Sequence, residues 1–237
     1  MDINHVSRIS DKASNRILRV LSQSAPELNS FESVSLHSGM VLQEPDREID
    51  HVYFPEQGLV SLLCVNSEGG MIEVGVIGHE GVVGIPAILG GLSPYRAVVQ
   101  IEGQAWRTSR LRITDEFQRN RWLRDALLKY ANSFMIQLAQ SSICNCFHTL
   151  QERLSRWLLL ARDASKNDRL EVTHDLLARL LGTRRASVTV TAGLLQRSGL
   201  IKMSRGEIVI VDPAGLEAIA CECYNIVRDG VRRAQTQ

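Results

Sequence analysis

The sequence lacks the marks of a membrane protein, a secreted protein and several classes of enzyme. No apolar run approaches the roughly 20 residues that a membrane-spanning helix needs. Met1 to Arg19 are polar and of mixed charge, unlike a signal peptide. There is no Walker-type phosphate loop, no HExxH motif, no GxSxG motif and no internal repeat. We therefore expect a cytoplasmic globular protein with no membrane partner and no catalytic residues.

Cysteine is scarce and unevenly spaced. The five cysteines include two C-x-C pairs, Cys144/Cys146 and Cys221/Cys223. Their odd number and their spacing fit neither a disulfide framework nor a CxxC zinc site. Residues two apart on a helix point to different faces, so we expect buried or half-buried thiols and assign no metal ligand. A redox-sensing thiol is the alternative.

Charge of one sign is concentrated in a single segment. The 237 residues are 44% hydrophobic and 22% charged with a net charge of +1, which is ordinary for one large or two modest domains. Between Arg179 and Gly206, however, there are six basic residues and no acidic one. A locally basic module on a neutral chain is typical of a DNA-binding protein. The six are Arg179, Arg184, Arg185, Arg197, Lys202 and Arg205.

The basic segment has the capping and turn residues expected of a helix-turn-helix. Thr173 can cap a short helix, Gly182 supplies a turn, and Thr183 can cap a second helix that starts at Arg184. Two short strands, 201–203 and 208–211, follow and form a hairpin around Arg205. The residues that suit the buried face of the second helix are Val188, Leu194 and Leu195.

The start of the second helix carries the predicted base contacts. In a helix-turn-helix this end enters the major groove. Arg184 and Arg185 can donate paired hydrogen bonds to guanine, Ser187 and Thr189 can bond to bases or phosphates, and Ala186 can meet a thymine methyl group. The alternative is a surface helix that happens to carry two arginines.

The preceding residues divide into a β-rich part and a helical part. A helix is predicted from Ser10 to Leu28. From Phe31 to about Arg112, short β-type runs alternate with glycine turns, which predicts an antiparallel barrel or jelly roll. The expected strands are 34–36, 52–54, 59–65, 72–77 and 97–106.

A long helix is predicted from Arg112 to about Ser142, and a further amphipathic helix from Thr149 to Arg162. On the long helix a stripe at alternating steps of four and three residues resembles a heptad seam. We interpret it as a dimer seam, with a second stripe (Ala126, Met135, Leu138) facing the barrel; the alternative is a helix packed on its own domain. The seam comprises Leu123, Leu127, Tyr130 and Phe134, continued by Gln137 and Ser141.

The order of barrel, long helix and winged helix-turn-helix resembles the Crp/Fnr family of bacterial transcription regulators. VYFPEQGLVSLL (52–63) and EVGVIGHEGVVG (73–84) are similar to that family's cyclic-nucleotide-binding-like barrel, and LLGTRRASVTVTAGLLQRSGLI (180–201) to its recognition segment. The implied fold is α+β. Its implied parts are an N-terminal helix and jelly-roll barrel (1–112), a dimerisation helix (113–147) and a winged helix-turn-helix domain (148–237).

The resemblance implies a homodimer on a roughly palindromic operator in double-stranded DNA, with RNA polymerase as a further partner. Arg185 matches the first arginine of the family's recognition helix. Ala186 stands where the family usually has Glu, and Val190 stands where it usually has a second Arg. The family's best-known operator is therefore not expected here. Thr173, His174 and Arg205 are implied as phosphate contacts. The full set of expected DNA contacts is Thr173, His174, Thr183, Arg184, Arg185, Ser187, Thr189 and Arg205.

The effector pocket departs further from the family. A cyclic-nucleotide binder has Gly-Glu followed about ten residues later by Arg and a small residue. Here Gly84 is followed by Ile85, although Arg96 and Ala97 match the second motif. Isoleucine cannot accept a hydrogen bond from the ribose, and an unpaired buried hydroxyl costs about 1–3 kcal/mol. We expect weak or no cAMP binding, and Arg96 holds another anion or is structural.

Three other kinds of signal are considered for this chain: redox state, haem and a metal ion. The family's iron–sulfur members carry N-terminal cysteines, and this chain has none before Cys64. His79 and His148 are the candidate haem or metal ligands. The effector is unknown from the sequence, so the alternatives are a redox-, haem- or metal-responsive regulator and a constitutive regulator with an empty barrel.

Overall fold

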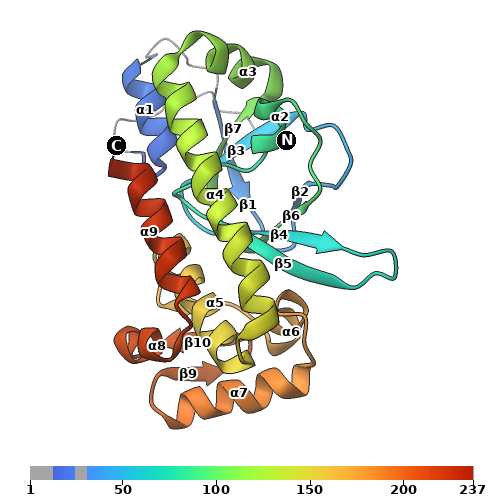
Figure 1. The fold of residues 1–237 in the computed structure, drawn as a ribbon, viewed down its shortest axis with the longest axis vertical. Helices are drawn as coiled ribbons and strands as arrows, with labels where there is room; N and C mark the ends of the chain where they lie inside the picture. Colours follow the sequence, from blue (N-terminus) through green and yellow to red (C-terminus); the bar gives the residue numbers. More distant parts are fainter. Residues whose placement is uncertain (1–12, 25–30, 237) are drawn as a thin grey trace.

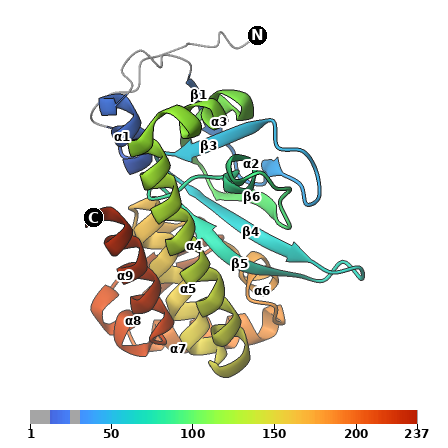
Figure 2. The same ribbon diagram turned by 45° about the horizontal axis from the view of Figure 1, so that its top comes forward.

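The chain forms a β domain and a mainly helical C-terminal domain, with one long helix running past both (Figures 1 and 2). The structure is a computed structural model that describes residues 13–24 and 31–236. This arrangement confirms the predicted α+β fold class. Among the described helices, none combines the length and the apolarity needed to cross a bilayer.

The β domain consists of two antiparallel sheets, as expected for a jelly roll. In the described residues the ladders do not join into one closed barrel. The first sheet has the order β1-β7-β3, formed by Glu32–Leu36, Gly103–Ser109 and His51–Pro55. The second has the order β2-β6-β4-β5, formed by Val41–Gln43, Arg96–Ile101, Leu59–Val65 and Met71–Ile77.

The segment predicted as one strand from Ala97 to Trp106 is two strands in different sheets. The chain leaves β6 at Ile101 and enters β7 at Gly103. A Cβ atom at Gly103 would lie 2.1 Å from the carbonyl oxygen of Gln57, so this crossing requires glycine. The short strand β2 and the short helix α2 (Ile85–Leu89) were not predicted.

The long helix begins later than the sequence suggested. The helix predicted from Arg112 is two helices, α3 (Arg110–Arg119) and α4 (Arg121–Phe147). Asn120 separates them because its side-chain oxygen accepts hydrogen bonds from the backbone N–H groups of Trp122 and Leu123, both at 3.1 Å. This is an N-cap, which fixes the start of α4.

The predicted dimer seam is wrong, because its residues are buried inside their own chain. Leu123, Leu127, Tyr130 and Phe134 belong to the core of the β domain. Of the stripe predicted to face the barrel, Met135 is instead 59% exposed. A heptad-like stripe indicates that a face is covered but does not say what covers it. Here the β domain covers it, so the alternative interpretation of that stripe holds.

The C-terminal domain begins at the capping box of Thr149 and Glu152. Helix α9 (Cys223–Thr236) then returns along α4 (Figures 1 and 2). Helix α1 (Arg16–Ser24) also contacts α4; residues 10–12 and 25–28 of its predicted span lie outside the described residues. The remaining elements are α5 (Leu150–Ser165), β8 (Arg169–Leu170), α6 (His174–Leu180), α7 (Arg185–Arg197), β9 (Ile201–Ser204), β10 (Glu207–Ile210) and α8 (Pro213–Ile219).

Candidate nucleic-acid interface

Helices α6 and α7 form the predicted helix-turn-helix. Thr173 caps α6, since its hydroxyl accepts a hydrogen bond from the N–H of Leu176 at 3.2 Å. Gly182 adopts φ of 59° in the turn between the helices, a conformation that favours glycine. Helix α7 begins at Arg185 with Arg184 as its N-cap residue. The predicted cap at Thr183 is therefore wrong by one residue, and no side chain caps α7.

One face of α7 is buried in the C-terminal domain. Val188 and Leu195 are fully buried, as predicted, together with Ala192. Leu194 was also assigned to this face, but it is 41% exposed and lies on the side that faces solvent. The exposed face of α7 therefore carries an apolar side chain that does not pack in the domain core.

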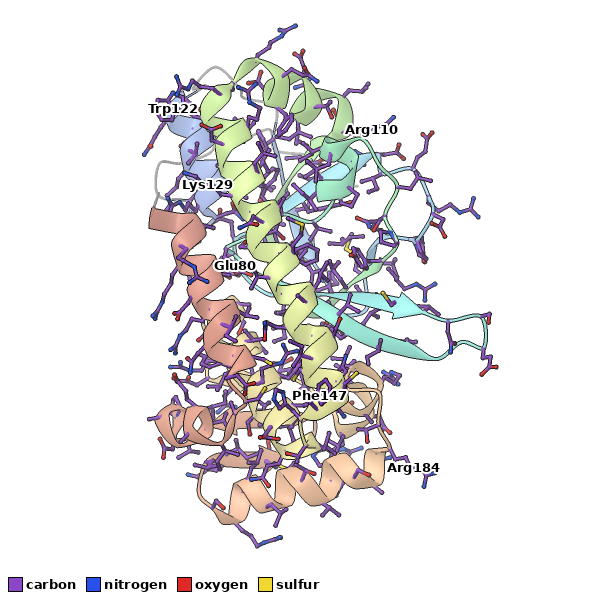
Figure 3. All side chains as sticks on the ribbon, viewed as in Figure 1. Glu80, Arg110, Trp122, Lys129, Phe147 and Arg184 are labelled. Carbon is purple, nitrogen blue, oxygen red and sulfur yellow. The ribbon has the colours of Figure 1, made fainter. Side chains whose placement is uncertain are left out.

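The exposed face of α7 combines positive charge with small and apolar side chains. Arg184, Arg185, Ala186, Thr189 and Val190 are all exposed, while Ser187 is half-buried. Arg184 projects from the outer end of α7, away from the rest of the protein (Figure 3). A helix end that presents guanidinium groups beside methyl groups has the chemistry needed to contact base edges in a major groove.

Side chains in the first turn of α6 contact side chains in the first two turns of α7. The Nδ1 atom of His174 lies 3.0 Å from the hydroxyl of Thr189, and that hydroxyl donates to the carbonyl of Arg185 at 3.1 Å. Asp175 forms an ion pair with Arg185 at 3.3 Å. Both charged groups are mostly exposed, so this pair contributes at most about 1 kcal/mol and leaves Arg185 free to change partners.

A three-stranded sheet presents Arg205 beside this helix pair. Strands β9 and β10 are joined by the two-residue turn Arg205-Gly206, with Gly206 at φ of 77°. The hairpin confirms the predicted wing. Its third strand, β8, pairs with β10 and was not predicted. Arg205 is exposed at the tip.

In the β domain, the residues at the family's effector motif include a buried apolar side chain and an arginine that is paired with a carboxylate. Gly84 has φ of 101° and precedes α2, whereas the side chain of Ile85 is buried in the domain core. Ala97 is fully buried, and Arg96 Nε donates to a carboxylate oxygen of Glu44 at 2.8 Å. The site therefore has an apolar group where a ribose acceptor is needed, and its arginine is already paired.

The cysteines are arranged differently from the prediction. Cys144, Cys221 and Cys223 are buried as expected, Cys64 is half-buried, and Cys146 is exposed. The structure also brings Cys144, Cys221 and Cys223 together with His148. The sequence did not predict this cluster, because Cys144 and Cys221 are 77 residues apart. The available signal was the spacing of Cys144 and His148, which are one helical turn apart.

Comparisons with known proteins agree with this architecture. A sequence model of the cyclic nucleotide-binding domain matches residues 33–120, and one of the Crp-like helix-turn-helix domain matches residues 152–219. The transcriptional regulator SdrP of Thermus thermophilus is 28% identical over 197 residues, which cover 80% of this chain and 94% of that protein.

Solved structures share the fold at lower sequence identity. FixK2 from Bradyrhizobium japonicum has a TM-score of 0.68 at 15% identity, covering 80% of this chain and 96% of that one. A Crp/Fnr-family regulator from Thermus thermophilus has a TM-score of 0.61 at 23% identity, covering 80% and 98%. A β domain of the cyclic-nucleotide-binding type joined to a Crp-like helix-turn-helix defines a class of transcription regulators. This chain belongs to that class, the Crp/Fnr family.

Proposed function

We propose that the protein is a sequence-specific, homodimeric DNA-binding regulator whose helix α7 reads the major groove. The observation that carries this proposal is the exposed start of α7. Arg184 and Arg185 stand there beside Ala186, Thr189 and Val190, on a helix braced by α6. None of these side chains packs in the core of the domain, whereas all of them would contact DNA in an interface formed by α7.

Arg185 is the residue proposed to read a guanine. Its guanidinium can donate two hydrogen bonds to O6 and N7 once it leaves Asp175. Val190 stands where the family commonly has a second arginine, and a valine can only make apolar contact with a thymine methyl group. The operator should therefore differ from the family's best-known sequence at the position that Val190 faces.

Thr173, His174 and Arg205 are proposed to contact phosphates rather than bases. Thr173 and His174 lie at the first turn of α6, and Arg205 lies at the tip of the wing. Such contacts set the position of the protein on the duplex but carry no sequence information. They should give binding its dependence on salt concentration.

The proposed dimer uses the face of α4 that lies opposite the β domain. Leu128 is 46% exposed and Met135, seven residues later, is 59% exposed; Ala139 continues the same stripe. Repeats of seven residues on an exposed helix face suit pairing with a second copy. A two-fold pair would present two α7 helices to successive major grooves of a palindromic site. RNA polymerase is then the expected protein partner of the DNA-bound dimer.

The β domain is proposed not to respond to cAMP. The buried side chain of Ile85 supports this, as does the ion pair between Arg96 and Glu44. A constitutive regulator and a metal- or redox-responsive regulator are the remaining alternatives. The cluster of Cys144, His148, Cys221 and Cys223 favours the metal-responsive one.

The test is a selection of genomic fragments by the purified protein at near-physiological salt, with and without cAMP. A palindromic motif recovered equally in both arms is the expected result. Recovery only with cAMP would contradict the proposal for the β domain. Recovery of no motif in either arm would contradict sequence-specific binding.

A further inference from the structure

Four side chains with metal-binding chemistry meet beside the joint between α4 and the C-terminal domain. Cys144 and His148 lie one turn apart at the end of α4, and Cys221 and Cys223 lie where the turn after α8 meets the start of α9. Their ligand atoms are all within 4.8 Å of one another. We propose that these three cysteines and the histidine bind one zinc ion.

The distances fit a single tetrahedral ion. Cys144 Sγ lies 3.6 Å from Cys221 Sγ, and Cys223 Sγ lies 3.6 Å from His148 Nδ1. In a tetrahedral site with Zn–S of ~2.3 Å and Zn–N of ~2.0–2.1 Å, sulfur atoms are about 3.8 Å apart and sulfur is about 3.6 Å from nitrogen. An iron–sulfur cluster distributes its ligands over several iron atoms and so holds them farther apart. The spacing therefore favours a mononuclear site.

The second nitrogen of His148 has the partner that a zinc-binding histidine requires. Its Nε2 atom lies 3.4 Å from a carboxylate oxygen of Glu222. Histidines that bind a metal through one nitrogen commonly donate a hydrogen bond to a carboxylate through the other, which fixes the tautomer and the ring orientation. Glu222 is thus a positioning residue that leaves Nδ1 free to bind the metal.

A buried arginine balances the charge of the site. Arg156 is only 8% exposed, and its Nε and one of its Nη atoms have no hydrogen-bond partner. It lies close enough to Cys144, Cys221 and Cys223 to interact electrostatically with each. Three thiolates on Zn²⁺ leave one negative charge, which a neighbouring buried guanidinium stabilises. Arg156 therefore complements the metal-bound state.

The site would act as a clamp between two distant segments of the chain. All four ligands come from the protein, which is typical of structural rather than catalytic zinc. The ion would hold the start of α9 against the end of α4, two segments separated by 77 residues between Cys144 and Cys221. Helix α4 carries the proposed dimer face and leads into the DNA-binding domain. Zinc would therefore fix the angle between α4 and the DNA-binding domain. This consequence rests on the proposed function.

Metal content of the full-length protein tests the site. Wild type and Cys146→Ser, a control on the same helix whose thiol is exposed, should retain one zinc ion per chain after washing with a weak chelator. Cys221→Ser and His148→Ala should lose it. Folding of each variant is checked by circular dichroism. Equal zinc in Cys146→Ser and Cys221→Ser would overturn the assignment.

Cobalt replacement gives a readout that does not depend on whether the variants fold. Wild type loaded with Co²⁺ should show the thiolate-to-cobalt charge-transfer band and the intense visible bands of a tetrahedral site. A folded wild-type protein that takes up neither metal would refute the proposal. So would a Cys144–Cys221 disulfide, or iron accompanied by acid-labile sulfide.

Operator affinity tests the clamp separately. Removal of zinc should weaken binding to the selected operator by about tenfold, within the usual range of coupling between sites. Equal affinity with and without zinc would refute the clamp. A zinc-loaded protein that binds no DNA sequence selectively would refute the proposed function while leaving the metal site intact.

Discussion

The side-chain amide of Gln137 makes two hydrogen bonds to the backbone of Val76. Its Oε1 atom accepts from the N–H at 2.7 Å, and its Nε2 atom donates to the carbonyl at 3.1 Å. Val76 lies in β5, the edge strand of the four-stranded sheet. The amide thus replaces the strand that is missing at this edge. It also fixes the buried face of α4 to its own β domain.

Gln137→Ala should destabilise the protein by about 2 kcal/mol, because a buried N–H and a buried carbonyl lose their partner. The free energy of unfolding in urea measures this. Gln118→Ala, the same substitution at an exposed site on α3 away from the proposed dimer face, is the matched control and should change stability by less than about 0.5 kcal/mol. Equal effects of the two substitutions would show that the amide is not holding the edge strand.

Met135→Glu should dissociate the proposed dimer, since an unpaired charge buried in the proposed interface costs about 3 kcal/mol, or roughly a hundredfold in Kd. Sedimentation velocity over a range of concentrations measures the change. Leu111→Glu, at a site on α3 that is 76% exposed, makes the same kind of substitution away from α4 and should leave the dimer intact. Persistence of the dimer in Met135→Glu would place the interface elsewhere.

Glu73 should make stability fall as pH rises from about 4.5 to about 7. Burial raises the pKa of its carboxyl to about 7, although a hydrogen bond from Ser61 and the charge of Arg156 oppose the rise. In this window the unfolded chain has lost the proton and the folded chain keeps it, so the unfolded state binds fewer protons and rising pH favours it.

Glu73→Gln should remove this pH dependence and stabilise the protein above pH 7 by up to about 3 kcal/mol. Urea unfolding between pH 4.5 and pH 8 measures the slope. Glu68→Gln, an exposed carboxylate in the turn between β4 and β5, should leave the slope unchanged. If Glu73→Gln keeps the wild-type slope, another group is responsible for it.

The sequence predicted the DNA-binding module more accurately than the helix preceding it. Thr173 and Gly182 have local roles, a cap and a left-handed turn, that neighbouring residues determine. The cap of α7 at Arg184 was missed because it lacks a capping side chain. The face of α4 that holds Leu123 and Phe134 was assigned to the wrong partner, because periodicity shows burial but not the covering surface.

Spacing indicates only the Cys144–His148 half of the cluster, because the approach of Cys221 and Cys223 depends on the tertiary fold. Cys144 and Cys146 diverge on a helix, as expected, and only Cys144 is buried. Cys221 and Cys223 lie instead where a turn leads into α9, and there residues two apart can point to the same side. The return of α9 along α4 brings this turn to Cys144 and His148, and nothing in the local sequence encodes that return.

Arg205→Ala should weaken binding to all DNA sequences alike, because the wing arginine is proposed to contact phosphate. The slope of log affinity against log salt concentration should fall by about 1. Arg119→Ala, an exposed arginine on α3, is the control and should change neither quantity. An unchanged salt slope in Arg205→Ala would remove the wing from the interface.

Base reading by α7 is tested by a base-by-base affinity measurement on the selected operator with wild type, Arg185→Ala and Arg185→Lys. We predict that both variants lose about 1–3 kcal/mol of discrimination at one guanine of each half-site. Arg185→Lys should keep most of its affinity for non-specific DNA, because lysine retains the charge but not the paired donors. An equal loss of affinity on every sequence would contradict base reading by α7.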